Sequence, residues 1–423
     1  RLAINHCSHS TYSSVISLSL RYYHTGVAGS CQLGCDRPPL ALQSIQSETQ
    51  SPAETLMTTT IVIMIDGLDP EYLELCPAPR LEELATAGTR LNVRGMMPSV
   101  TNVNNVSLVT GSYPESHGIT SNYWLDREQG GEHYMESPEY LRSETMFQRA
   151  TNKGMRSLLV TAKDKLRLLL SDGTTVSVSS EQPPDWVVNG VGTPPDIYSL
   201  EVNRWVLDAG RFILSQSDFD LVYLTTTDYA MHSHAPDEPE SARHIAMLDE
   251  GIGKLVDALP DARFLVTADH GMSSKSRMLH LPEDLARAGI KARAIPIIKD
   301  QYTVHHSNLG GCIYIHLEGN NDNPGPALEV LRNIDGVEEA LSREDAASRF
   351  KLMPERIGDI MALGGHDVVF GDPSEVTLPQ NLRSHGSAHE LDIPVIAYGQ
   401  GLEITNFREN RSLGRYVIDH VLS

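Results

Sequence analysis

Cysteine is scarce in this chain of 423 residues. It occurs five times, and three of the five lie between positions 7 and 35. The other two, Cys76 and Cys312, do not form the dense framework that staples small secreted domains. This usage is typical of a reducing compartment, so we predict a cytoplasmic protein.

Basic residues and long apolar runs are also in short supply. Lysine and arginine total 34 against 55 aspartate and glutamate residues, which gives a formal net charge of -21. Such acidity argues against nucleic acid or an acidic membrane as a partner, since both need a basic face. No apolar run is long enough to span a bilayer. A small anion remains a suitable ligand if bound metal ions supply positive charge.

The first 56 residues differ in composition from the rest. They are rich in serine and hold a single acidic residue, Asp36, before Glu48. Such a segment fits organelle targeting or an upstream extension that does not fold, and we favour the extension. The remaining length, in a chain that is 40% apolar, suits one large domain with an insertion, or two domains.

Apolar strands alternate with helical patterns through most of the chain. Short runs rich in β-branched residues predict strands, and apolar residues at helical spacing predict helices between them. This alternation indicates an α/β fold with a mostly parallel sheet between layers of helices. The predicted strands are residues 61–65, 91–94, 157–161, 221–225, 263–267 and 393–398. The predicted helices are residues 80–87, 143–152, 197–215, 240–259 and 413–421, with a loop over 181–195.

The regular alternation of predicted strands and helices stops after Gly271. Residues 276–379 mix short strands, helices and turns, which predicts a smaller α+β cap inserted into the core. The core is then expected to comprise residues 57–275 and 380–423.

A segment over residues 98–122 places Thr101 at the start of a helix. Its apolar positions recur at helical spacing, and Gly111 provides the stop. Free amides and the helix dipole favour an anion at such an N-terminus. A hydroxyl in this place, taken alone, is more often a simple N-cap. The apolar set is Val103, Val106, Val109 and Thr110.

Three of the predicted strands run into an aspartate: Asp66, Asp228 and Asp269. Ligands bind outside the carboxyl ends of parallel strands, so these side chains are expected at one edge. Singly, each aspartate is more often a turn or cap residue. Three carboxylates brought together repel one another unless cations neutralise them, which indicates a metal site.

The histidine spacing supports that metal site. His232 follows Asp228 by four residues and so shares its helix face, His270 follows Asp269 directly, and His385 stands in a short loop before the last strand. Any one of these histidines alone could equally be a surface or hydrogen-bonded residue. Together, aspartate and histidine without cysteine favour zinc over manganese or iron.

Two metals about 4 Å apart would suit a tetrahedral phosphorus substrate. They would hold its oxygens and lower the pKa of the Thr101 hydroxyl, so that an alkoxide attacks phosphorus. An activated water would then hydrolyse the phospho-threonine intermediate.

The motifs IDG, a threonine at a helix start, DxxxH, DHG and a late HG occur in this order. They resemble the alkaline phosphatase superfamily, in the branch that holds nucleotide pyrophosphatase/phosphodiesterases and phosphonoacetate hydrolases. The resemblance covers about residues 58–423. It implies two zinc ions, with Thr101 both as nucleophile beside the second and as a ligand to that metal. The implied ligands are Asp228, His232 and His385 for one zinc and Asp66, Asp269 and His270 for the other.

Several segments are most similar to those of phosphonoacetate hydrolases: MPSVTNVNN, HGITSNYW, TAKDKL, TDYAMHSHAP and RSHGS. This similarity implies that Asn122 hydrogen-bonds a phosphonate oxygen and that Lys163 and Lys165 recognise the substrate carboxylate. Breaking a carbon–phosphorus bond leaves a carbanion, and ammonium groups beside the carboxylate would stabilise it as the enolate of acetate. Without the similarity, AKDK would be taken as a solvated turn.

Rival interpretations stay open at this point. A nucleotide pyrophosphatase/phosphodiesterase would use the same metals and nucleophile, and a phosphoglycerate-mutase-like enzyme is less favoured because it uses serine. A metal-dependent binding protein without catalysis is the non-enzyme alternative. The expected partner is a small anionic organophosphonate, with neither nucleic acid nor membrane, and a homodimer is left open.

Overall fold

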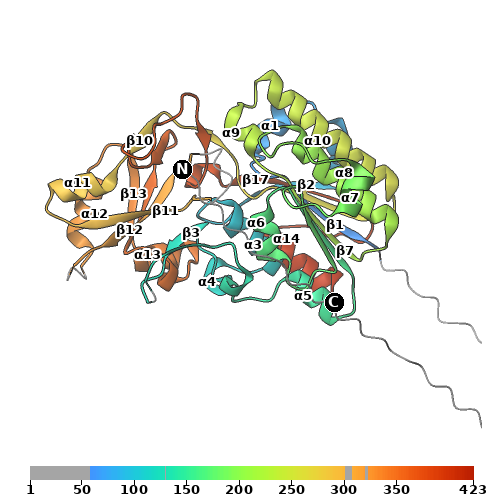
Figure 1. The fold of residues 1–423 in the computed structure, drawn as a ribbon, viewed down its shortest axis with the longest axis horizontal. Coiled ribbons are helices and arrows are strands. Elements are labelled where there is room, and N and C mark those ends of the chain that lie inside the picture. The colour runs from blue at the N-terminus through green and yellow to red at the C-terminus, as the bar shows by residue number, and fades with distance from the viewer. Residues whose placement is uncertain (1–57, 129, 301–306, 320–322) are drawn as a thin grey trace, which may run out of the picture. The chain divides into compact units, whose positions relative to one another are not determined.

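A seven-stranded sheet organises the part of the chain that the structure describes (Figure 1). The computed structural model describes residues 58–128, 130–300, 307–319 and 323–423. Contacts group Leu56 to Ser423 into one compact unit. The predicted extension, residues 1–56, lies outside the described residues.

The sheet has the strand order β2-β17-β8-β1-β7-β5-β6. Strands β8, β1, β7, β5 and β6 pair in parallel, and β17 runs antiparallel to both of its neighbours. The predicted class, α/β with a mostly parallel sheet, is therefore confirmed. The strands are β1 (Thr60–Met64), β2 (Thr89–Arg94), β5 (Ser157–Thr161), β6 (Val176–Ser179), β7 (Leu221–Thr225), β8 (Arg263–Thr267) and β17 (Asp392–Tyr398).

Helices cover both faces of this sheet. Helices α8 and α10 pack together on one face, and α3 packs against α14 and α5 on the other (Figure 1). Every residue of β1, β5 and β7 is buried, as their continuous apolar runs predict. The core helices are α1 (Pro70–Leu75), α2 (Pro79–Ala87), α3 (Thr101–Thr110), α4 (Pro114–His117), α5 (Met146–Asn152), α6 (Asp164–Leu170), α7 (Asp185–Val191), α8 (Glu201–Gln216), α9 (Tyr229–Ser233), α10 (Pro239–Ala258) and α14 (Asn410–Tyr416).

Short elements complete the core. Two small strand pairs flank the sheet, and a π-helical turn extends α14 to the chain end. These elements are β3 (Tyr123–Leu125) with β4 (Glu132–Tyr134), β9 (Ser273–Ser274) with β16 (Arg383–Ser384), the turns η1 (Pro138–Tyr140) and η3 (Ala388–Glu390), and η4 (Val417–Val421).

Two glycines fix the position of α3. Gly111 ends the helix in the left-handed conformation with φ of 61°, which glycine adopts without strain. Gly414 lets α14 approach α3 closely, because a Cβ at this position would lie 1.6 Å from the carbonyl oxygen of Leu108. The helix that begins at Thr101 is thus held from its far end.

The smaller cap has its own sheet and its own apolar cluster. Its four strands are all antiparallel in the order β11-β12-β14-β13, and residues such as Leu285, Ile315 and Leu331 form its core. The cap elements are β10 (Arg277–Leu279), α11 (Leu281–Arg287), β11 (Ala292–Pro296), β12 (Cys312–Leu317), α12 (Gly325–Arg332), β13 (Val337–Ser342), α13 (Arg343–Phe350), η2 (Pro354–Arg356), β14 (Ile360–Gly364) and β15 (Val368–Phe370).

Three local predictions are wrong. The stretch 181–195 is predicted to be a loop, yet it holds α7, which starts after Pro184 and has Gly192 as its C-cap. The helix predicted from 143 begins at Met146, because Thr145 forms a capping box with Gln148. The helix predicted from 197 begins at Glu201.

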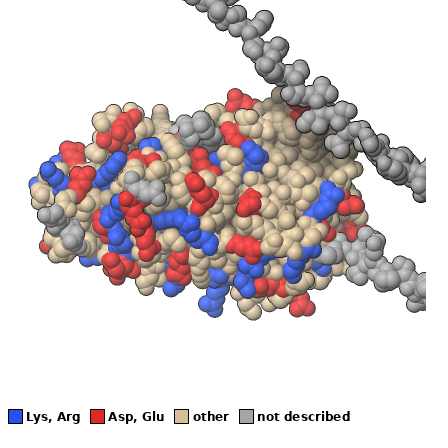
Figure 2. Space-filling view, turned by 60° about the horizontal axis from the view of Figure 1, so that its bottom comes forward, with Lys and Arg blue, Asp and Glu red and all other residues tan. Residues whose placement is uncertain are grey.

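The surface mixes charges of both signs. On the face shown in Figure 2, lysine and arginine side chains are interspersed with aspartate and glutamate. Within the described residues, no helix is both long and apolar enough to cross a membrane.

Candidate metal centre

The three predicted aspartates lie at the carboxyl edge of the core sheet. Asp66 follows β1, Asp228 follows β7 and precedes α9, and Asp269 follows β8. Their side chains are buried, with at most 1% of each residue exposed. Because β1 pairs in parallel with both β7 and β8, the three strands deliver their aspartates to the same edge.

His385 reaches this edge from the opposite direction. It precedes β17, and β17 runs antiparallel to β8. The amino end of β17 therefore lies beside the carboxyl ends of its neighbours. This reversal explains why one ligand candidate comes before its strand and the others come after theirs.

One predicted ligand set converges as a group. Asp228, His232 and His385 each offer a ligand atom within 4.8 Å of the others. The Nε2 atom of His232 lies 2.8 Å from Oδ2 of Asp228, and that of His385 lies 3.5 Å from the same oxygen. The i, i+4 spacing from Asp228 to His232 on α9 produces this contact, as predicted from the sequence.

The second group shares Asp228 with the first. Asp66, Asp228 and His270 bring ligand atoms within 4.8 Å of one another. The fourth candidate, Asp269, has Oδ1 engaged by the amides of Gly67 and His270, while its Oδ2 lies 3.5 Å from Nε2 of His270. Two adjoining cation sites are therefore compatible with the arrangement, and the assignment of Asp269 to the second stays a prediction.

All three histidine rings are oriented through Nδ1. That atom donates to a backbone carbonyl in each case, at 2.6 Å to Arg383 for His232, 2.6 Å to Ser99 for His385 and 2.9 Å to Gly271 for His270. Such a bond fixes the tautomer and leaves Nε2 as the ligand atom. The roles of Ser99 and Arg383 could not be predicted from the sequence, since a carbonyl contact 286 or 151 residues away leaves no sequence signal.

The buried charges of the aspartate and histidine cluster favour a bound cation. Burial and the neighbouring carboxylates raise the pKa of Asp66, and burial raises that of Asp269 to about 6. Burial also lowers the pKa of His385 well below its usual range. Three buried atoms that face one another have no hydrogen-bond partner among the described residues: Oδ1 of Asp66, Oδ2 of Asp269 and Nε2 of His270. Unsatisfied oxygen and nitrogen atoms at this spacing fit divalent metal ions.

Lys163 places its ammonium group inside the cluster. Its Nζ lies 3.0 Å from Oδ2 of Asp66 and 2.8 Å from Oδ1 of Asp228, and only 1% of the residue is exposed. Burial disfavours the charged lysine, but Asp228 and Asp66 outweigh this cost and raise its pKa. The structure thus pairs Lys163 with two ligand candidates, and its predicted contact with a substrate carboxylate stays a prediction.

Thr101 is the first residue of α3, and it is buried. The N-cap residue is Val100, and no side chain caps this helix, so the interpretation of Thr101 as a simple N-cap is wrong. The adjacent amide of Asn102 donates to Oδ1 of Asn122 at 3.3 Å, so Asn122 lies at the start of α3, and its bond to a phosphonate oxygen stays a prediction.

Asp300 joins two predicted substrate-binding residues. It accepts a hydrogen bond from Nδ2 of Asn122 at 3.2 Å and forms an ion pair with Lys165. Asp300 itself is 5% exposed. It follows β11 within the cap, where the sequence offers no chemical motif, so this role could not be predicted from the sequence.

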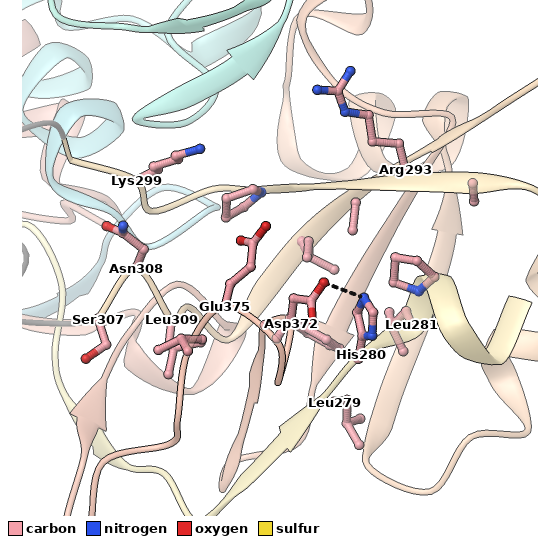
Figure 3. Close-up of a pocket in the computed structure, with 18 of the residues that line it drawn as sticks. Leu279, His280, Leu281, Arg293, Lys299, Ser307, Asn308, Leu309, Asp372 and Glu375 are labelled. Carbon is pink, nitrogen blue, oxygen red and sulfur yellow. Dashed lines mark ion pairs between the residues drawn. The ribbon is translucent and has the colours of Figure 1, made fainter. Parts of the chain in front are cut away.

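The cap contains a separate pocket of about 920 Å³ (Figure 3). Leu279, Leu309 and Phe370 line it, together with polar side chains such as His280 and Asp372, and Nε2 of His280 lies 3.5 Å from Oδ2 of Asp372. None of the ten predicted site residues lines this pocket.

Comparison with known proteins agrees with this geometry. The family model described as type I phosphodiesterase/nucleotide pyrophosphatase matches residues 60–388. The chain therefore belongs to the type I phosphodiesterase/nucleotide pyrophosphatase family, a branch of the alkaline phosphatase superfamily of metal-dependent hydrolases.

Within this family, two solved structures of phosphonoacetate hydrolase from Sinorhizobium meliloti 1021 are similar to the chain at 32% identity. One is in complex with phosphonoformate and the other with phosphonoacetate. They cover 86% of this chain and 96% of theirs, with TM-scores of 0.79 and 0.78. Murine ectonucleotide pyrophosphatase/phosphodiesterase 5 shares the fold, at 18% identity and a TM-score of 0.66 over 86% of this chain and 95% of its own.

Curated relatives match over a shorter span. Ectonucleotide pyrophosphatase/phosphodiesterase family member 1 of Mus musculus is 29% identical over 239 residues, which is 54% of this chain and 25% of the relative. The venom phosphodiesterase of Naja atra is 26% identical over 245 residues, or 54% of this chain and 28% of the relative. The matched region thus spans about a quarter of the length of these relatives.

Proposed function

We propose that the chain is a two-zinc hydrolase that cleaves the carbon–phosphorus bond of phosphonoacetate to give acetate and phosphate. The observation that carries this proposal is the buried cluster of three aspartates and three histidines, with two ligand groups that share Asp228. Similarity at 32% identity to proteins described as phosphonoacetate hydrolase supports the choice of substrate.

Two sets of residues would each bind one metal ion. Asp228, His232 and His385 would hold one zinc ion, and Asp66, Asp269 and His270 the other. Bound zinc supplies Lewis-acid stabilisation of charge on the substrate and on the nucleophile. The amide N–H groups at the start of α3 add partial positive charge beside Thr101, where a phosphonate would lie.

The reaction would proceed by displacement at phosphorus. The Oγ of Thr101 forms a bond to phosphorus as the carbon–phosphorus bond breaks, and the electron pair leaves on the methylene carbon as the enolate of acetate. The proton of the Thr101 hydroxyl passes through water to that carbon, which gives acetate. A second water then hydrolyses the phospho-Thr101 ester, which releases phosphate and restores the hydroxyl. Asn122 would donate to a phosphonate oxygen during both steps.

The lysines would recognise the other end of the substrate. Lys163 and Lys165 each pair with an aspartate in this structure, so their Nζ atoms already lie beside carboxylate oxygens. Binding of the substrate carboxylate requires both lysines to exchange a partner. That exchange is favoured for Lys163 when other positive charges neutralise Asp66 and Asp228, because these carboxylates then hold its ammonium less tightly.

The family match favours a second candidate, a nucleotide pyrophosphatase/phosphodiesterase with the same metals and nucleophile. The two candidates differ at the leaving group. Expulsion of an aryl or nucleoside oxygen needs no ammonium pair, whereas expulsion of a carbanion does. Loss of Lys165, which does not contact the candidate ligands, would therefore leave the second activity unchanged.

The test compares two substrates on one zinc-loaded preparation. Phosphate release from phosphonoacetate is measured beside turnover of bis-p-nitrophenyl phosphate at equal enzyme concentration. The proposal expects phosphonoacetate to be the better substrate by a large factor. Turnover of the diester alone would refute the substrate assignment and favour the second candidate. No turnover of either, with zinc bound, would indicate a binding protein.

The proposal also covers the cellular location and the partners of the chain. Cys76 and Cys312 are both free and buried, which fits a reducing, cytoplasmic location. The partner is a small anionic organophosphonate, with no nucleic acid or membrane involved. A homodimer is compatible with this setting.

A further inference from the structure

Glu390 is a buried carboxylate that lies outside the proposed ligand sets. It belongs to the turn η3, just after the loop that carries His385, and it is 2% exposed. Its Oε2 accepts from the backbone amide of Ser387 at 2.9 Å and from the Ser387 hydroxyl at 2.7 Å. These two bonds close the loop that follows His385.

The other oxygen of Glu390 reaches the loop that follows His270. Its Oε1 accepts from Nζ of Lys275 at 2.9 Å and from the hydroxyl of Ser273. Its backbone carbonyl accepts from the amide of Gly271 at 2.7 Å. One residue therefore bonds to both loops that present candidate ligands.

These two loops must keep a fixed relative position if His270 and His385 are to bind metal side by side. The imidazole rings of His270 and His385 stack with centroids 3.5 Å apart and an angle of 9° between their planes. Ser99 supports the same loop, because its hydroxyl donates to the carbonyl of Ser387 at 2.7 Å and accepts from the amide of Gly386 at 2.9 Å. Ser99 lies two residues before Thr101, so this contact joins the loop that follows His385 to the start of α3.

Lys275 extends the connection into the cap. Its ammonium group donates to the carbonyl of His366, between β14 and β15, at 2.9 Å. Both members of the Lys275–Glu390 ion pair have fully buried side chains. A buried pair of this kind costs desolvation energy and is strongly disrupted when one member alone is neutralised.

We propose that Glu390, paired with Lys275, is a positioning residue that holds the loops of His270 and His385 in the geometry needed to bind metal. The inference rests on the metal centre of the proposed function and adds a residue to it. Glu390 acts through the loops and does not touch substrate or metal. Partners of this kind change metal affinity by about 10- to 100-fold when they are altered.

The experiment measures metal binding as well as activity. Wild-type protein, Glu390→Gln and a control, Asp249→Asn, are stripped of metal and titrated with Zn²⁺ against a chromophoric chelator. The same proteins are loaded with Co²⁺ for visible absorption, and melting temperatures are recorded without metal. Asp249 is a matched control because it is also a buried carboxylate, and it accepts from the amides of Arg80 and Leu81 at the start of α2.

The expected result is selective for Glu390→Gln. Its zinc affinity falls about 10- to 100-fold and its cobalt absorption changes. Asp249→Asn lowers the melting temperature with unchanged zinc affinity and absorption. A Glu390→Gln protein with wild-type zinc affinity and absorption would overturn the inference, whatever its melting temperature.

Two further outcomes are distinguishable. If Glu390→Gln does not fold, Ser387→Ala removes a single hydroxyl from the same connection and should weaken zinc binding about 2- to 10-fold. Wild-type affinity in Ser387→Ala would then overturn the inference. If the wild-type protein binds neither ion, the metal centre itself is wrong and the inference falls with it.

Discussion

The carboxyl edge of the core sheet and the pocket of the cap differ in how far their charged side chains are buried. At the core edge, charged side chains are buried, and the histidines are fixed by backbone carbonyls. In the cap pocket, charged side chains are partly exposed, and His280 and Asp372 form an ion pair between half-buried side chains. Such exposed pairs contribute little energy, whereas a buried charge without a partner costs several kcal/mol.

This difference indicates where chemistry can take place. Buried groups with fixed orientations can hold a metal and a reacting phosphorus atom at constant geometry, because they lose little freedom when the ligand binds. The cap pocket offers volume and charged groups that are partly exposed to solvent. We therefore expect the core edge to control rate and metal binding, and the cap pocket to contribute weakly to either.

The largest effect should follow from Thr101→Ala. Loss of the nucleophile should raise the barrier by about 5 kcal/mol or more, a fall of several orders of magnitude in kcat. Zinc content should stay near wild type because the aspartate and histidine ligands remain, and the melting temperature because the Thr101 side chain does not cap α3. The control is Thr110→Ala on the same helix, whose hydroxyl donates to the carbonyl of Val106. Robust turnover by Thr101→Ala would exclude Thr101 as the nucleophile.

Asp228→Asn should reduce metal content as well as rate. Asp228 belongs to both candidate ligand groups, so its loss weakens both sites. Metal analysis of the purified protein should therefore show less bound zinc, and removal of zinc from the wild type with a chelator should reproduce the loss of activity. Thr101→Ala, which keeps its metal, separates the two causes. Full zinc content in Asp228→Asn would show that its carboxylate is not a ligand.

Lys165→Ala should have an intermediate effect that depends on the substrate. Loss of one ammonium donor beside the developing negative charge should cost about 2 to 4 kcal/mol, or roughly 30- to 1,000-fold in kcat/KM for phosphonoacetate. Turnover of bis-p-nitrophenyl phosphate should change little, because its leaving group carries no carboxylate. Equal losses for both substrates would indicate a structural role through Asp300.

The sequence predicted the core edge far better than the residues that support it. The strands and their aspartates could be located because continuous apolar runs end in aspartate, and the spacing from Asp228 to His232 identified a helix face. Ser99, Asp300 and Glu390 could not be found in this way, since each acts on partners that are distant in the sequence. Helix α7 was hidden for another reason, because the prolines before it were taken as evidence of a loop.

Lys299→Ala should have the smallest effect and tests the cap side of the comparison. Lys299 lines the cap pocket, lies 4.4 Å above the ring of Tyr123 and has a side chain that is 34% exposed. Its loss should cost less than about 1 kcal/mol of unfolding free energy and leave both turnover rates within about two-fold of wild type. Lys299 and Lys165 carry the same charge, but Lys165 is more deeply buried and pairs directly with Asp300, whereas Nζ of Lys299 lies 3.9 Å from Oε2 of Glu132. If Lys299→Ala impaired phosphonoacetate turnover as strongly as Lys165→Ala, the charge of the substrate would be recognised in the cap. Burial and fixed orientation would then no longer explain which residues take part in the reaction.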